Sequence, residues 1–347
     1  MDIADLASRQ AIENVLARHS RGVDRADEAL LSGAYHSDAT VDYGFFQGPA
    51  SELAAMLASA QRNALPTLHR TSNMWIRAEG KQAVSESYVI AYVEEPALQR
   101  LVLGRYLDRH ACRDGQWALT HRTYVMDANV NRANSCARPN PSDDPAAYAS
   151  QGGKGASDPG NALLVHHMLS SAPARPSKGT VSMSQDIVDA VLSRAAIADL
   201  VCAYARGVDR GDVELLKSVF HDDATVMCGI ANGRGTEFAQ AIIAFVTDNL
   251  DRCFHSTSNS WIEVDGDSGA GEHYVIAHMT AGGQDIMTGG RYIDRYERRD
   301  GTWKIASRSF VMDWNSTQPT SHETDGFYGA LTTRGSFGRS DPVYAVW

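Results

Sequence analysis

The chain has 347 residues, more than the roughly 100 to 200 of a single domain, so its length predicts two domains. Its 32 Lys and Arg against 42 Asp and Glu give a formal charge of −10. No basic cluster is present that could hold a phosphate backbone, so nucleic acid is not expected as a partner. Neither a run of eighteen apolar residues nor a charged-then-apolar leader is visible, which predicts a cytoplasmic protein without a membrane partner.

The cysteines and histidines do not form a metal-binding pattern. Five cysteines are scattered without a CxxC pair, which favours reduced thiols over a disulfide framework. His166 and His167 are adjacent but have no acidic or thiol companions. Glycine-rich nucleotide motifs and a GxSxG elbow are absent as well. We therefore expect no metal and no cofactor, so any chemistry must come from ordinary side chains.

The predicted elements begin with helices and end with strands. Apolar residues recur at helical spacing between 12 and 23, with the polar His19 on the inner face, and Gly22 suits the end of this helix. Asp27 is the predicted N-cap of a second helix in "DEALLSGAY", and "SELAAMLASAQ" reads as a third. The later runs "SESYVIAYV", "RLVLGRYLDRHA" and "WALTHRTYVMD" alternate like strands and turn at Asp114-Gly115. This order predicts an α+β fold.

The second half of the chain repeats the first. The stretch "RGVDRAD" at 21–27 returns as "RGVDRGD" at 206–212, and "HRTSNMWI" at 69–76 returns as "HSTSNSWI" at 255–262. The repeat is a whole domain with its tail, far longer than the ~20 to 50 residues of a solenoid unit. We predict a first domain over residues 1–160, a Pro-, Ser- and Gly-containing linker over 161–185 and a second domain over 186–347.

These motifs together carry a family resemblance. Three helices followed by a meander, with "GVDR" ending the first helix, "HxTSN" opening the sheet and "GRYxD" near a "DGxW" hairpin, resemble the SnoaL-like branch of the nuclear transport factor 2-like superfamily. The resemblance covers roughly residues 1–135 and 186–320. It implies two tandem cone-shaped domains, each with three helices packed in a curved antiparallel sheet around an apolar pocket. Scytalone dehydratase, hexachlorocyclohexane dehydrochlorinase and the bile-acid dehydratases, which this chain resembles in chemistry, use an Asp and His pair without a cofactor.

Carried over by position, the resemblance implies a catalytic pair in each copy. The predicted catalytic residues are Asp24 and His69 with His19 in the first copy, and Asp209 and His255 with Tyr204 in the second. An elimination needs a base that titrates near neutral pH, which imidazole provides, and a neighbouring carboxylate orients it and stabilises the imidazolium. Taken alone, an aspartate at a helix end is more often a cap or the partner of a surface cation.

A wider set of side chains is predicted to contact the substrate. It consists of Arg122, Arg308, Tyr43, Asn73, Asn259, Tyr92 and His278. Arg122 and Arg308 enter by resemblance to the dehydrochlorinase pocket, whereas the two asparagines have an alternative role in capping the turn after "TS". Tyr43 becomes Cys228 and Tyr92 becomes His278 in the second copy, which indicates two substrate shapes, one lapsed pocket, or surface drift.

Other repeated residues are assigned to structure. The tryptophans at 75, 117, 261 and 303 are predicted to pack in the core. Arg105 and Arg291 of the "GRY" motif are expected to point outward and to pair with Asp108 and Asp294.

The leading functional hypothesis is a cofactor-independent lyase acting on a hydrophobic, ring-containing small molecule, with loss of water or another leaving group. One alternative is a retro-aldol lyase that releases formaldehyde or another small aldehyde from an aryl diol. Others are an isomerase and a non-catalytic binding module, because a fold by itself does not determine function. The two domains are expected to pack on each other as a pseudo-dimer, and a further homo-oligomer is an open alternative.

Overall fold

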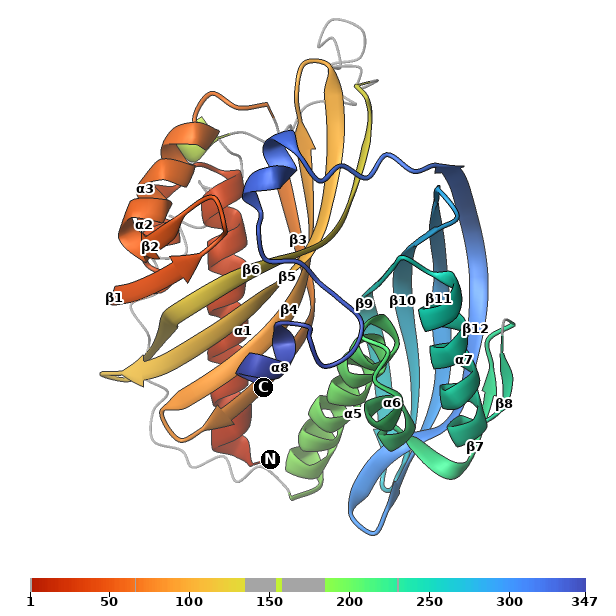
Figure 1. Cartoon of the computed structure of the whole chain (residues 1–347). Helices are drawn as coiled ribbons and strands as arrows, with labels where there is room; N and C mark the ends of the chain where they lie inside the picture. Colours follow the sequence, from red (N-terminus) through yellow and green to blue (C-terminus); the bar gives the residue numbers. More distant parts are fainter. Residues whose placement is uncertain (1, 66, 135–153, 158–184, 230) are drawn as a thin grey trace, which may run out of the picture.

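The computed structural model describes residues 2–65, 67–134, 154–157, 185–229 and 231–347 (Figure 1). The predicted linker over 161–185 and the His166–His167 pair therefore lie outside the described residues, apart from Gln185. None of the described helices is long and apolar enough to cross a membrane.

The first domain is built from three helices and one six-stranded sheet. The helices are α1 (Ile3–Asp24), α2 (Glu28–Ser32) and α3 (Ala50–Gln61). The strands are β1 (Tyr35–Asp42), β2 (Gln47–Pro49), β3 (Thr67–Glu79), β4 (Gln82–Glu94), β5 (Leu98–Arg113) and β6 (Gln116–Ala133). Their order across the sheet is β2-β1-β6-β5-β4-β3.

The second domain repeats this arrangement. Its helices are α5 (Gln185–Asp209), α6 (Val213–Ser218) and α7 (Gly235–Asn249). Its strands are β7 (Phe220–Met227), β8 (Asn232–Arg234), β9 (Arg252–Asp265), β10 (Ser268–Ala281), β11 (Gln284–Arg299) and β12 (Thr302–Pro319), in the order β8-β7-β12-β11-β10-β9. The predicted fold class, two tandem α+β domains with curved sheets, is confirmed.

One detail of the predicted sheet is wrong, because each sheet is mixed rather than antiparallel. Strand β1 pairs parallel to β6, and β7 pairs parallel to β12. The hairpins between β3 and β6 join chain neighbours, so their antiparallel pairing can be predicted from turn signals such as Asp114-Gly115, whose φ angles are 51° and 77°. Strand β6, the parallel partner of β1, lies far along the chain, so no local sequence pattern predicts this pairing.

The repeated "RGVD" motif has a structural role at the junction of two helices. Gly22 lies in the last turn of α1, and a Cβ atom there would be 2.8 Å from Cβ of Leu31 in α2. Gly207 makes the same close approach to Leu216. Asp27 accepts a hydrogen bond from Leu30 N at 2.9 Å, which confirms the predicted N-cap. The motif therefore forms a sharp turn between the two helices, directly after its aspartate.

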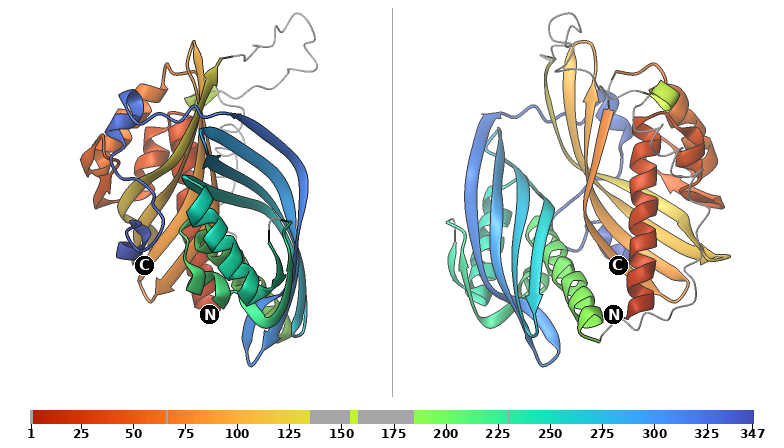
Figure 2. Two further views of the ribbon diagram at one scale, coloured as in Figure 1. Left: turned by 45° about the vertical axis from the view of Figure 1, so that its right-hand side comes forward. Right: turned by 180° about the vertical axis from the view of Figure 1, so that it is seen from behind.

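The C-terminal segment, residues 320–347, leaves the second domain and covers the first. It contains two short helices, η2 (Gly326–Ala330) and α8 (Val343–Val346), and Figure 2 shows it in blue against the orange and yellow strands of the first domain. Met126 N donates to Thr333 O and Gly335 N donates to Met126 O, both at 3.0 Å. The segment is thus bonded to the backbone of β6, and it joins the two domains.

Two of the structural assignments need correction. Trp75 and Trp303 are buried, but Trp261 is 69% exposed. Trp75 is buried because Trp347 of the C-terminal segment packs against it, with ring centroids 4.7 Å apart. The partners of Arg105 were also predicted wrongly. Arg105 is completely buried, and Asp108 and Asp294 pair instead with Arg122 and Arg308.

Candidate active site

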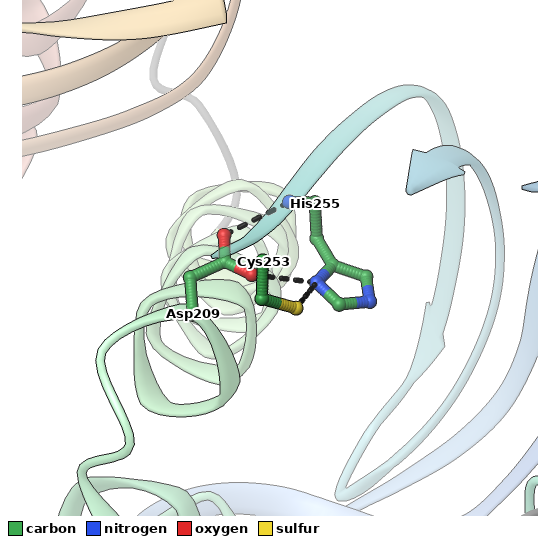
Figure 3. Close-up of side chains that lie close together, drawn as sticks. All are labelled: Asp209, Cys253 and His255. Atoms are coloured by element: carbon green, nitrogen blue, oxygen red, sulfur yellow. Dashed lines mark hydrogen bonds and ion pairs between the residues drawn. The ribbon is translucent and has the colours of Figure 1, made fainter. Parts of the chain in front are cut away.

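The aspartate that ends α5 holds a histidine of β9 by two hydrogen bonds. Asp209 Oδ2 accepts from the backbone N–H of His255 at 2.9 Å, and Oδ1 lies 2.6 Å from His255 Nδ1 (Figure 3). Asp209 is almost completely buried, whereas the side chain of His255 keeps some access to solvent. The paired hydrogen bonds leave the imidazole ring little freedom to rotate.

The first domain contains the same pair. Asp24 Oδ2 accepts from His69 N at 2.8 Å, and Oδ1 lies 2.7 Å from His69 Nδ1. The repeated aspartate therefore has one geometric role in both copies, because it binds the first residues of the strand and orients the ring. The structure brings together both pairs that the sequence analysis placed together.

The charge of Asp209 determines the tautomer of its histidine. Burial by itself raises the pKa of Asp209, but His255, the hydrogen bonds from it and the nearby Arg210 outweigh burial and lower the pKa of Asp209 below its ordinary value. An ionised carboxylate can only accept, so Nδ1 must donate to it. In the neutral ring the lone pair is then on Nε2, the nitrogen that a general base uses.

His255 lies on a cavity of about 470 Å³ in the second domain. Most of its walls are apolar, as in pockets that bind hydrophobic small molecules. The lining residues are Tyr204, Val208, Cys228, Gly229, Phe238, Ile242, Phe245, Val246, Leu250, Cys253, His255, Val275, Ala277, Met279, Thr288, Tyr292, Phe310 and Met312. The predicted Tyr204 and His255 therefore share one cavity.

Tyr204 is a protonated phenol on the wall of this cavity. Burial raises the pKa of Tyr204 well above its ordinary value, with the neighbouring Tyr292 adding to the effect. The guanidinium of Arg308 lies 4.0 Å from the centre of the Tyr204 ring and binds Asp294 through two hydrogen bonds of 2.8 and 2.6 Å. Arg308 is not among the residues that line the cavity, so it contacts Tyr204 from outside the cavity wall.

In the first domain, the two positions that match Cys228 and Tyr204 hold Tyr43 and His19. Tyr43 stands where the second domain has Cys228, and its ring stacks on Tyr124 with centroids 5.7 Å apart. His19 stands in the place of Tyr204, with Nε2 at 3.5 Å from the Tyr43 hydroxyl. Burial lowers the pKa of His19 well below 6.5, and the nearby Arg122 and His69 add to the effect. His19 is therefore neutral at pH 7.

His69 instead borders a polar surface cleft. The cleft measures about 340 Å³, and its lining includes the charged Glu13 and Arg21 of α1 and Arg25, the C-cap of that helix. The C-terminal segment adds Tyr328 and Leu331 to the core that contains Tyr43. The two copies thus share the Asp–His geometry and differ in what the histidine faces.

The predicted asparagines lie away from the cavity. Asn73 Nδ2 donates to His255 O and Asn73 Oδ1 accepts from Thr257 N, both at 2.7 Å, so the amide joins β3 to β9 across the domain interface. Asn73 and Asn259 have φ angles of 45° and 46° at the irregular point of their strands. Asn259 is exposed.

Tyr92 and His278 also point away from the histidines of the dyads. Ala91 lies opposite His69 in the sheet and Ala277 lies opposite His255, so the next residue of each strand faces the other side. His278 is fully buried there, with Nε2 at 3.4 Å from Asp285 Oδ1. Burial by itself raises the pKa of Asp285, but this contact and other hydrogen bonds outweigh burial and lower the pKa to about 2.

Cys253 is a cavity residue that the sequence analysis did not single out. Its Sγ lies 3.6 Å from His255 Nδ1 (Figure 3). It stands two residues before His255 on one strand, and this period-two spacing places both side chains on the same face. That spacing was the available signal, and Thr67 occupies the same position in the first copy.

Asp209, Cys253 and His255 also form the one cluster among the described residues with metal-ligand potential, with ligand atoms within 4.8 Å of one another. Two ligands of a tetrahedral zinc ion are separated by about 3.3 Å, given metal–ligand distances of about 2.0 Å. The 2.6 Å between Asp209 Oδ1 and His255 Nδ1 is instead the length of a charge-assisted hydrogen bond. This geometry fits a catalytic pair better than a metal centre.

Comparison with known proteins identifies the same two units. The SnoaL-like domain family matches residues 4–123 and 189–309. Gamma-hexachlorocyclohexane dehydrochlorinase of Sphingobium indicum is 32% identical over 132 residues, which cover 37% of this chain and 85% of that protein. Hexachlorocyclohexane dehydrochlorinase 1 of Sphingobium indicum is 30% identical over 135 residues, covering 37% and 86%. A crystal structure of a type 2 hexachlorocyclohexane dehydrochlorinase is 30% identical and covers 40% of this chain and 96% of its own, with a TM-score of 0.37.

Proposed function

The chain belongs to the SnoaL-like domain family, and we propose that it is a cofactor-independent lyase whose second domain acts on a hydrophobic, ring-containing small molecule. The observation that carries the proposal is the placement of His255. Its ring is oriented by an ionised Asp209 and borders an apolar cavity of about 470 Å³. Relatives at about 30% identity are dehydrochlorinases, which supports elimination as the class of reaction.

The proposed reaction begins with proton removal. His255 Nε2 takes a proton from a carbon of the substrate, and the electron pair of that C–H bond becomes the new double bond. The bond to the leaving group on the adjacent carbon breaks, and the leaving group departs with its own electron pair. Asp209 stabilises the imidazolium that forms, because its carboxylate accepts the Nδ1 hydrogen bond. The apolar walls exclude water and strengthen this interaction.

The leaving group is either a halide or a hydroxyl group. A halide leaves without a proton, as the names of the relatives suggest for those proteins. A hydroxyl group leaves more readily as water, and the phenol of Tyr204 can supply the proton it needs. Tyr204 on the cavity wall therefore favours a dehydratase as the second candidate.

The first domain is proposed to have little part in this chemistry. Its histidine borders a cleft with charged residues, and the positions that match Cys228 and Tyr204 hold Tyr43 and His19, which contact each other. A neutral His19 next to the hydroxyl of Tyr43 is a poor proton donor. The kept Asp24 and His69 pair then serves mainly to join α1 to β3.

The test is a pair of matched variants with a panel of substrates. Purified protein is incubated with a chlorinated cyclohexane, hydroxysteroids and aryl diols, and chloride, a conjugated chromophore and free aldehyde are measured. We expect His255→Ala to lower kcat by about 10² to 10⁴, as for a lost general base, and His69→Ala to lower it far less. Equal losses would contradict the assignment to the second domain. Unchanged turnover in His255→Ala would remove the basis for the proposed base, and aldehyde release would favour the retro-aldol alternative.

A further inference from the structure

A cluster of six charged residues is buried where the two domains and the C-terminal segment meet. Three arginines face three carboxylates, so their charges balance, and every member is at most 8% exposed. The members are Glu86, Arg105 and Asp127 of the first domain, Arg206 of α5, Arg210 directly after α5, and Asp341 of the C-terminal segment. This interdomain ion cluster is outside the cavity of the second domain.

Arg210 connects this cluster to the catalytic pair. It follows Asp209 directly in the chain, and its Nη2 donates to Cys253 O at 3.2 Å, two residues before His255. One arginine is therefore joined to Asp209 through the chain and to the strand of His255 through Cys253 O. A small void of about 20 Å³, lined by Asp127, Asp209 and Arg210 among others, lies directly behind the aspartate.

The two carboxylates that hold Arg210 come from outside the second domain's own sheet and helices. Its Nη1 donates to Asp127 Oδ1 and to Asp341 Oδ2, both at 3.1 Å. Asp127 is in turn held by Arg105, at 2.8 and 2.9 Å, and Asp341 by the same guanidinium at 2.9 and 2.7 Å. The position of Arg210 thus depends on strand β6 of the first domain and on the C-terminal segment.

The first domain supplies a second anchor on the same helix. Arg206, one turn before Arg210, donates from Nε to Glu86 Oε2 at 2.6 Å. Its guanidinium packs against the rings of both Trp75 and Trp347, 4.0 Å from each centroid. The end of α5, where Asp209 stands, is therefore bound to the first domain at two successive turns.

We propose that Asp127 and Asp341, acting through Arg210, are positioning residues for the Asp209–His255 pair, so that the first domain and the C-terminal segment complete the active site of the second. Two physical effects carry this role. The guanidinium fixes the separation between the end of α5 and the start of β9, and its charge is one of the causes that lower the pKa of Asp209. Other titratable groups near Asp209 are Cys253, His255, Tyr88 and Tyr292. The role in turnover rests on the proposed function, whereas the orientation of the pair does not.

The orientation is tested by a signal that needs no substrate. The Nδ1 protons of His255 and His69 each lie in a short hydrogen bond to a carboxylate, so each should give a low-field proton NMR resonance, assigned with His255→Gln and His69→Gln. We expect Asp127→Asn, Asp341→Asn and Arg210→Gln to shift or broaden the His255 resonance and to leave the His69 resonance unchanged. Glu272→Gln is the matched control, since Glu272 holds the place of Glu86 in the second copy and pairs with Arg291 at 3.4 Å.

Turnover provides the second readout. With a substrate in hand, we expect Asp127→Asn and Asp341→Asn to lower kcat by about 10- to 100-fold at a nearly constant KM, the effect of a small misplacement of the base. Arg210→Lys keeps the charge but not the two-sided contact, and should fall between Arg210→Gln and the unchanged protein. An unshifted His255 resonance in folded Asp127→Asn and Asp341→Asn would overturn the inference. If these variants lose the His255 resonance while the unchanged protein turns over none of the substrates on the panel, the inference is supported and the proposed function is contradicted.

Discussion

Replacing Arg308 with methionine separates two roles for a residue that was predicted to bind substrate. Arg308 Nε and Nη2 bind the two oxygens of Asp294 at 2.8 and 2.6 Å, and both side chains are almost completely buried. The guanidinium also lies 4.0 and 4.2 Å from the ring centres of Tyr204 and Tyr292. These contacts predict that Arg308 supports the fold of the second domain in addition to any effect on binding.

The expected cost follows from the unpaired carboxylate. Removing one member of a buried ion pair typically destabilises a protein by about 3 to 5 kcal/mol, since the remaining charge has lost its partner. For a domain of about 150 to 250 residues, each kcal/mol shifts Tm by roughly 2 to 4 °C, so Arg308→Met should lower the Tm of the second domain by roughly 6 to 20 °C. Adding Asp294→Asn removes the uncompensated charge and should recover at least half of this loss.

The assay is thermal unfolding followed by circular dichroism, with binding of an apolar fluorescent probe to report the cavity. Arg122→Met in the first domain is the matched variant, because Arg122 binds Asp108 through two hydrogen bonds of 2.7 Å. An unchanged Tm in Arg308→Met together with lost binding of the probe would refute the structural reasoning and favour a direct role in binding. A double variant no more stable than Arg308→Met would show that the charge of Asp294 is not the cause.

Three further predictions concern the rest of the molecule. Burial lowers the pKa of His110 to about 4, the nearby Asp108 offsetting only part of the effect, so the unfolded chain binds a proton below pH 6.5 that the folded chain does not. This residue should therefore make the free energy of unfolding in urea roughly 2 kcal/mol lower at pH 5 than at pH 7. His110→Gln should show a smaller change with pH, and an equal change in both proteins would contradict the prediction. A Cβ at Gly335 would clash with Asp127 Oδ1, so Gly335→Ala should destabilise the docked C-terminal segment by about 1 to 3 kcal/mol. Limited proteolysis should then remove the segment faster. An unchanged rate of cleavage would show that the segment can adjust to the extra methyl group. Because the geometry of Asp209 and His255 fits a hydrogen-bonded pair, turnover should survive EDTA, and activity lost in EDTA and restored by a divalent ion would reveal a metal site.

Much of the architecture follows from local patterns in the chain. The repeated motifs predict two similar units, because equal strings of caps, turns and apolar periods lead to equal elements, and both units have the same strand order. Asp27 as an N-cap and the turn at Asp114-Gly115 depend on neighbours within four residues. The pairing of each aspartate with its histidine came from the family resemblance, and the structure places both pairs at hydrogen-bond distance.

What the residues contact across the molecule was decided by tertiary packing. Asn73 binds the backbone of His255, and Arg105 binds Asp341, partners 182 and 236 positions away in the chain. The same is true of the surroundings of the two histidines, since the difference between Tyr43 and Cys228 matters only once the sheet curves around them and the C-terminal segment covers one domain. Periodicity and capping act between neighbours along the chain, whereas burial and charge pairing depend on which distant surfaces meet, and no local pattern encodes that meeting.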